Sequence, residues 1–142
     1  MLEQKQLALA KSIVHWMDNL YMAENDKKFQ RGSYFCALCQ LHNVVCEDCI
    51  LYKYDVACVR SAGNHMAPFY RETWYANHSV FAVQPVWEMY AVLYAIYITE
   101  FGGEDEVLGK EIESWIQDVC KGLPEGDVRR CGILFDSSVG LL

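Results

Sequence analysis

Four closely spaced cysteines form the clearest chemical pattern in the chain. They make up two Cys-x-x-Cys pairs, CALC and CEDC, which are separated by six residues: Cys36, Cys39, Cys46 and Cys49. A Cys-x-x-Cys turn places two thiolates along one edge of a tetrahedron, and zinc is typically bound by four such ligands in structural sites. The spacing therefore predicts one structural Zn2+ ion held by all four thiolates.

Three further residues have the chemistry to replace one of these ligands: Cys58, His42 and His65. We keep them as alternates, because spacing alone does not fix the ligand set. A site closed by four sulfur atoms has no coordination position for a water molecule, so the zinc would stabilise folding rather than catalyse a reaction. The sequence accordingly gives us no catalytic residue and no residue that binds an organic cofactor.

A redox role for the paired cysteines is the alternative to metal binding. Redox-active Cys-x-x-Cys pairs typically lie at a helix N-terminus within a βαβ unit. The sequence shows neither the helix N-terminus nor the βαβ unit. The chain also has seven cysteines, an odd number, and a reducing compartment disfavours disulfides. These points favour a metal site.

Helical periodicity predicts three helices that would hold this segment in place. The first lies within residues 1–26, with an apolar stripe of Leu7, Ala10, Ile13, Val14, Met17, Leu20 and Tyr21. The second begins near Pro85, with Val86, Tyr90, Leu93, Tyr94 and Tyr97 on one face. The third extends from Glu104 to Lys121, with Leu108, Ile112, Trp115, Ile116, Val119 and Cys120 on one face. Apolar residues also cover the other sides of the second helix, so we expect it to be central.

The predicted fold is mainly α, as a single domain over residues 1–142. It comprises an N-terminal helix (1–26), a Cys-rich metal-binding segment (33–78), a two-helix hairpin (85–122) and a tail (128–142). About three helices would pack against the irregular, zinc-stapled segment, which has room for a short β-hairpin. Apolar residues make up 53% of the chain, which is enough for one buried core.

Acidic residues give the chain a formal charge of −7. Residues 100–127 account for it, with nine acidic and two basic side chains, while the rest of the chain is balanced. Because nucleic-acid binding depends on clustered Lys and Arg, we do not expect a nucleic-acid ligand. An acidic surface favours a basic protein partner, or else simply keeps the protein in solution.

A cytoplasmic location follows from two observations. The N-terminal residues contain charges in place of a signal peptide's apolar core. The most apolar stretch, Val86 to Ile98, has 13 residues and includes Glu88, whereas a membrane span needs ~20. We therefore expect no membrane association. The apolar surface around Val80 and Phe81 makes a homodimer credible.

The layout from CALC and CEDC through Cys58 to Ala67-Pro68-Phe69-Tyr70 and Trp74 resembles that of small cysteine-rich proteins of unknown function encoded by bacteriophages and prophages. The resemblance covers the 39 residues from Cys36 to Trp74. It implies a bacterial cytoplasmic setting, that of the host if the chain is phage-encoded, and a metal-stapled fold.

These observations favour a non-enzymatic phage accessory protein that acts by protein–protein interaction, as an inhibitor of a host or bacterial-immunity protein. Two alternatives stay open. One is a small metal-dependent enzyme acting on nucleic acid or nucleotides. The other is a protein that sequesters a nucleotide signal, with Tyr70, Trp74 and Tyr75 as stacking surfaces.

Overall fold

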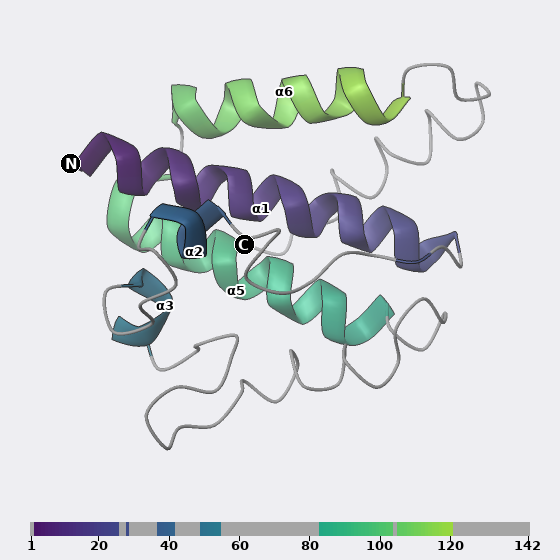
Figure 1. Cartoon of the computed structure of the whole chain (residues 1–142), viewed down its shortest axis with the longest axis horizontal. Coiled ribbons are helices and arrows are strands. Elements are labelled where there is room, and N and C mark those ends of the chain that lie inside the picture. Colours follow the sequence, from purple (N-terminus) through teal and green to yellow (C-terminus); the bar gives the residue numbers. More distant parts are fainter. Residues whose placement is uncertain are drawn as a thin grey trace.

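The computed structural model describes residues 2–25, 28, 37–41, 49–54, 83–103 and 105–120. These ranges contain the helices α1 (Leu2–Glu24), α2 (Ala37–Leu41), α3 (Ile50–Lys53), α5 (Val83–Phe101) and α6 (Glu106–Cys120) (Figure 1). No strand occurs within the described ranges. For this part of the chain the predicted mainly helical fold is confirmed. The predicted tail, 128–142, and most of the Cys-rich segment lie outside the described residues.

Helix α1 is buried on several sides. Its predicted stripe points inward, since Ala10, Ile13, Met17, Leu20 and Tyr21 are each at most 4% exposed. Other residues of α1 are buried as well: Ala8, Leu9, Ser12, Trp16, Asn19 and Ala23. A helix that packed on one neighbour would bury only a single stripe. The breadth of burial therefore indicates that α1 contacts more than one helix.

Helix α5 begins and ends at residues suited to those positions. Pro85 lies in the first turn, where a missing N–H removes no helical hydrogen bond. Gly102, with a φ of 101°, follows the last turn, and its N–H donates to the carbonyl of Ile98 at 3.0 Å. The predicted stripe is buried, as expected: Val86, Tyr90, Leu93, Tyr94 and Tyr97.

Helix α6 is capped by Asp105. The carboxylate Oδ1 of Asp105 accepts a hydrogen bond from the backbone N–H of Val107 at 2.7 Å, which satisfies one of the unpaired donors of the first turn. The helix therefore begins at Glu106, two residues after the predicted Glu104. Its inward face is as predicted at the buried residues Leu108, Ile112 and Trp115.

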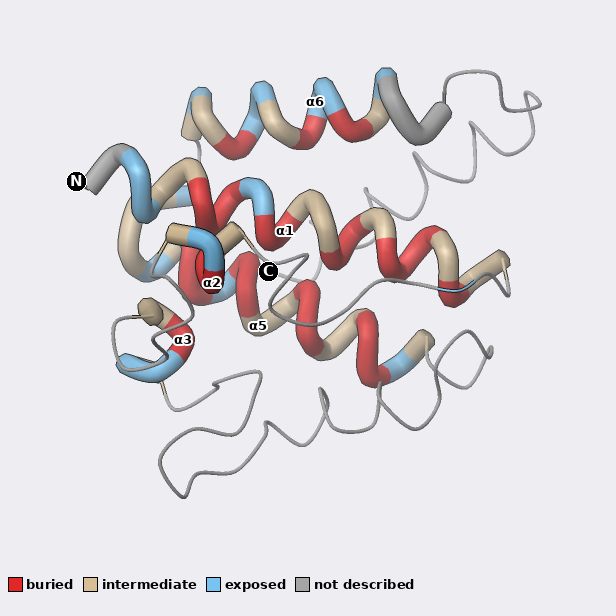
Figure 2. The backbone as a smooth tube through the Cα atoms, in the orientation of Figure 1, coloured by how far each residue is buried: buried red, intermediate tan, exposed pale blue. Residues whose placement is uncertain are grey.

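Helix α1 lies between α5 and α6 (Figure 1). It runs antiparallel to α5 and parallel to α6, and the contacts of Gln6 with Asp105 and of Asp18 with Trp115 follow the same order along both helices. Figure 2 shows the buried residues on the sides of α1, α5 and α6 that face one another. Our prediction that α5 is the central helix is wrong for the described part of the chain, because α1 packs against α5, α6 and α2.

Within the described ranges, no helix combines the length and the apolarity that crossing a bilayer requires.

Candidate functional site

Two of the predicted metal ligands, Cys39 and Cys49, lie in the described part of the chain. Cys39 is on α2 and is 8% exposed, and Cys49 directly precedes α3 and is half-buried. The other predicted ligands and alternates lie outside the described residues: Cys36, Cys46, Cys58, His42 and His65. The same holds for the aromatic residues Tyr70, Trp74 and Tyr75.

Helix α2 carries Cys39 onto the N-terminal half of α1. Leu38, next to Cys39, is 1% exposed and belongs to the main core. A groove of about 360 Å³ follows the seam between α1 and α2 and is lined by Leu7, Ala8, Lys11, Ala37 and other residues of the two helices. Packing of Leu38 thus fixes where the Cys39 thiol lies relative to α1.

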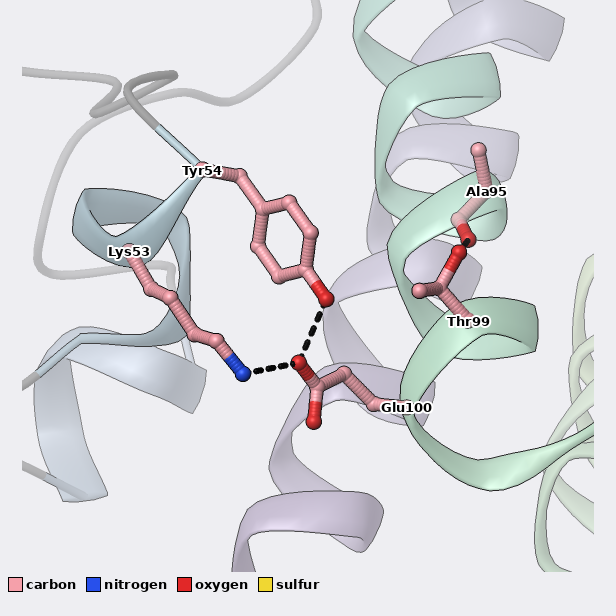
Figure 3. Close-up of polar contacts among 5 residues, drawn as sticks. All are labelled: Lys53, Tyr54, Ala95, Thr99 and Glu100. Atoms are coloured by element: carbon pink, nitrogen blue, oxygen red, sulfur yellow. Dashed lines mark hydrogen bonds and ion pairs between the residues drawn. The ribbon is translucent and has the colours of Figure 1, made fainter.

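Helix α3 fixes Cys49 to the end of α5. Leu51 is 2% exposed in the main core. The Lys53 ammonium lies 2.7 Å from Oε1 of Glu100, and the Tyr54 hydroxyl donates to the same oxygen at 2.5 Å (Figure 3). Lys53, and then Tyr54, lower the pKa of the Glu100 carboxyl through these contacts. We call the set Lys53, Tyr54 and Glu100 the α3 latch.

The two described cysteines are held at one end of the helical assembly. Cys39 packs beside the N-terminal half of α1, and Cys49 is linked through the α3 latch to the C-terminal end of α5. Those ends are joined directly, because the Gln6 side-chain amide donates to the Tyr97 hydroxyl at 3.1 Å and also to the Asp105 carboxylate. Burial, the largest cause, raises the pKa of Tyr97 to about 12.

The thiols of Cys39 and Cys49 suit zinc in their chemistry and in their shielding from solvent. Within the described ranges, no group of three or more His, Cys, Asp or Glu side chains is placed to hold a metal ion. Because only two of the seven candidate ligands fall in those ranges, the ligand set stays a prediction.

Cys49 occupies the N-cap position of α3, which the sequence did not reveal. Its backbone is extended, with φ −76° and ψ 138°, and its side chain makes no capping hydrogen bond. A thiol near a helix N-terminus is one of the features expected of a redox cysteine. The helix has only four residues, and the other expected feature, a βαβ frame, is not found within the described ranges.

A second candidate site lies between α1 and α6. A groove of about 390 Å³ runs along the contact between the two helices. It is lined by Lys11, Val14, His15 and Asp18 of α1 and by Glu111, Ser114 and Trp115 of α6. The lining residues recur at steps of three and four on each helix, so each set forms one stripe. We call this feature the α1–α6 groove.

Asp18 is a partly buried acidic group of the α1–α6 groove. Burial raises the pKa of its carboxyl, and the indole of Trp115 beside it partly opposes that rise. One helical turn before Asp18, the half-buried His15 has its Nε2 atom 3.4 Å from the side-chain amide nitrogen of Asn19 and its ring edge against Trp16. A concave site with a partly buried carboxylate is a recognised indicator of a binding or active site.

Sequence reasoning did not find the α1–α6 groove. Lys11 and Asp18 are seven residues apart and lie beside the apolar stripe of α1, so periodicity could have shown that they share a face. It could not show that α6 runs parallel to α1 and brings Glu111 and Ser114 to the same place. That depends on the packing of distant helices.

Comparison of the chain with protein-family models, with curated proteins and with solved structures found no match.

Proposed function

We propose that the protein acts by binding another protein, without catalysis, and that the contact is made along α6 and the α1–α6 groove. The observation that carries this proposal is the groove itself, which combines an apolar wall of Val14 and Trp115 with the carboxylates of Asp18 and Glu111. Protein-binding sites typically combine an apolar centre with a polar rim. A partner's side chains could enter a groove of this size.

The charge of α6 indicates the kind of partner. Glu106 and Glu113 are exposed, and Glu111 is half-buried at the groove. The nearby Lys110 ammonium pairs with Glu106 on the same helix at 2.8 Å, so it does not offset the remaining carboxylates. An acidic surface speeds association with a basic partner and discriminates against acidic ones. We propose that the target presents a basic surface.

A structural zinc ion is part of the proposal. Cys36, Cys39, Cys46 and Cys49 would hold it, with Cys58, His42 and His65 as alternates. Bound zinc supplies folding energy, and with four thiolate ligands it has no open position for substrate. Its role would be to fix the Cys-rich segment on the end of the assembly where α2 and α3 pack.

The biological setting is proposed from the resemblance between Cys36 and Trp74. It supports a phage accessory protein that works in the cytoplasm of the bacterial host and inhibits a host or immunity protein. Small size and acidity suit that role, since such a protein can occupy a basic surface of its target.

Site-specific photo-crosslinking in a bacterial host lysate tests the proposed contact. A benzophenone amino acid would replace Ser114, which is exposed at the rim of the α1–α6 groove. The matched control would replace Ala95, which is exposed on α5. We expect one stoichiometric protein to crosslink at position 114 and not at position 95. Failure to recover a stoichiometric partner at position 114, or equal labelling at position 95, would contradict the proposal.

Metal analysis tests the zinc site independently. Protein purified without added metal should contain one zinc per chain, with four thiols protected until a chelator is added. No zinc, or fewer protected thiols, would contradict the closed site.

A further inference from the structure

The α1–α6 groove carries opposite charges at its two ends. Lys11 and Asp18 both line it, and they are seven residues apart on α1. At 1.5 Å per residue this is a rise of about 10 Å along the helix. Because α6 runs parallel to α1, Trp115 lies beside Asp18 at the same end of the groove. At that end of the groove, the carboxylate of Asp18 therefore lies next to the aromatic ring of Trp115.

Among the described residues, the groove side chains Lys11, Asp18 and Glu111 form no ion pair. The ion pairs that join described side chains to one another are Lys53 with Glu100 and Lys110 with Glu106, and neither involves Asp18, Glu111 or Lys11. A partly buried carboxylate without a cation keeps a desolvation cost, which the Trp115 indole beside Asp18 offsets only in part. A cation that enters the groove from outside would remove that cost.

We propose that the Asp18 end of the α1–α6 groove binds an arginine side chain of a basic peptide segment on the partner protein. This inference rests on the proposed function and names the chemistry of its contact. An arginine fits better than a lysine, because its planar guanidinium can donate to carboxylates on two helices, Asp18 and Glu111, and can stack on an aromatic ring. Its methylene groups would lie along Val14.

Lys11 would fix the direction in which the peptide lies. The Lys11 ammonium repels any cation of the peptide at its own end of the groove. A peptide with one arginine would therefore bind with that arginine at Asp18. The partner's next residues would then be neutral or acidic where they pass Lys11.

Binding of short peptides, followed by the indole N–H resonance of Trp115, tests the inference on the full chain. The probes are blocked Gly-Arg-Gly and its neutral isostere Gly-citrulline-Gly. The Trp115 resonance would be assigned from the spectrum of Trp115→Phe. We expect the arginine peptide, and not the citrulline peptide, to move this resonance.

Two variants with the same change in charge make the test specific. Asp18→Asn should weaken binding of the arginine peptide about tenfold or more, because a buried charge pair loses one member. Glu88→Gln, on α5 and outside both α6 and the groove, should change it less than about twofold, because this carboxylate lies on another helix and does not line the groove. Equal responses to the two peptides, an unmoved Trp115 resonance or unchanged binding in Asp18→Asn would each overturn the inference.

Failure of this inference can be told apart from failure of the proposed function. If Ser114 crosslinks to a stoichiometric partner while the arginine peptide fails these tests, the protein binds its partner by other contacts and only the arginine site is wrong. If the crosslink fails at position 114, the proposed function is wrong whatever the peptides do.

Discussion

Helix α1 meets α5 on one side and α6 on the other, and the two contacts differ. Eight residues of α5 are buried, four of them with aromatic or leucine side chains: Tyr90, Leu93, Tyr94 and Tyr97. The described part of α6 buries Leu108, Ile112 and Trp115, and beside them it leaves the α1–α6 groove lined with charged groups. The α1–α5 contact thus buries more apolar side chains and should contribute more to stability. The α1–α6 contact buries fewer, and part of it is an accessible polar groove.

The largest expected effect is on the α1–α5 side. Leu93→Ala should lower the free energy of unfolding by about 4 kcal/mol, because Leu93 is surrounded by large buried side chains that cannot collapse into the cavity. Leu108→Ala, at a similarly buried leucine of α6, should cost about 2 kcal/mol, since the described part of α6 buries fewer large side chains than α5 does. Urea unfolding measures both. If Leu108→Ala lowered the free energy of unfolding as much as Leu93→Ala or more, the two helix contacts would not differ in their contribution to stability.

Tyr97 tests the polar contact that joins α1 to α5. Tyr97→Phe removes the acceptor of the Gln6 amide and should cost about 1 kcal/mol at neutral pH. Folding raises the pKa of Tyr97 from 10.0 to about 12, so the stability linked to it is full below pH 10 and is lost as the pH rises through 12. The variant should therefore lose less stability over that range. Parallel alkaline losses in the two proteins would contradict this.

Asp18 tests the cost of the α1–α6 groove. Burial raises the pKa of Asp18 above 3.8, so the ionised carboxylate disfavours folding. The stability that comes from protonating Asp18 is fully present below pH 3.8. It is lost as the pH rises through the pKa that Asp18 has in the folded protein. Asp18→Asn should therefore be more stable than the parent at neutral pH, by less than about 1 kcal/mol, and should lose this advantage in acid. Thermal unfolding at several pH values measures the difference, with Glu113→Gln as control. A less stable Asp18→Asn at neutral pH would contradict the prediction.

The smallest expected effect concerns the α3 latch, whose Lys53 is exposed and whose Glu100 is only half-buried, so that it contributes little to global stability. Glu100→Gln weakens the contacts of Lys53 and Tyr54, so α3 should detach more often and, once a chelator has been added, the Cys49 thiol should react faster with iodoacetamide. Mass spectrometry of the alkylated peptide measures the rate. Glu88→Gln, twelve residues earlier on the same helix, is the control. Equal alkylation rates in the two variants would show that the latch does not hold Cys49.

The three long helices could be predicted because their periodic apolar residues are local features. The stripe on α5 and the inward face of α6 were found at the right residues, and Pro85 placed the start of α5, whereas the Asp105 cap that begins α6 at Glu106, two residues after the predicted Glu104, was not foreseen. The order of packing could not be predicted, since a helix that is apolar on most sides, as α5 is, looks central whether or not it is. Small buried residues such as Ala8 and Ser12 were the overlooked sign that α1 has neighbours on several sides.

The candidate sites divide in the same way. The paired cysteines are a local motif, and Cys39 and Cys49 lie on or next to helices that pack into the core. The α1–α6 groove is non-local, because Asp18 and Trp115 are 97 positions apart and meet only through the parallel packing of two helices. Single-sequence reasoning has access to the first kind of site and not to the second.

The central place of α1 has a consequence for synthesis. The contacts that bury it come from late in the chain, as the 99-residue separation of Gln6 and Asp105 shows. A ribosome releases α1 before α5 and α6, so the sides of α1 that pack on these two helices stay uncovered until both have emerged. Contacts between residues this far apart in the sequence form late and leave a nascent chain open to chaperones and to aggregation. In this topology, α1 is made before α5 and α6 but is fully packed only after both have been made.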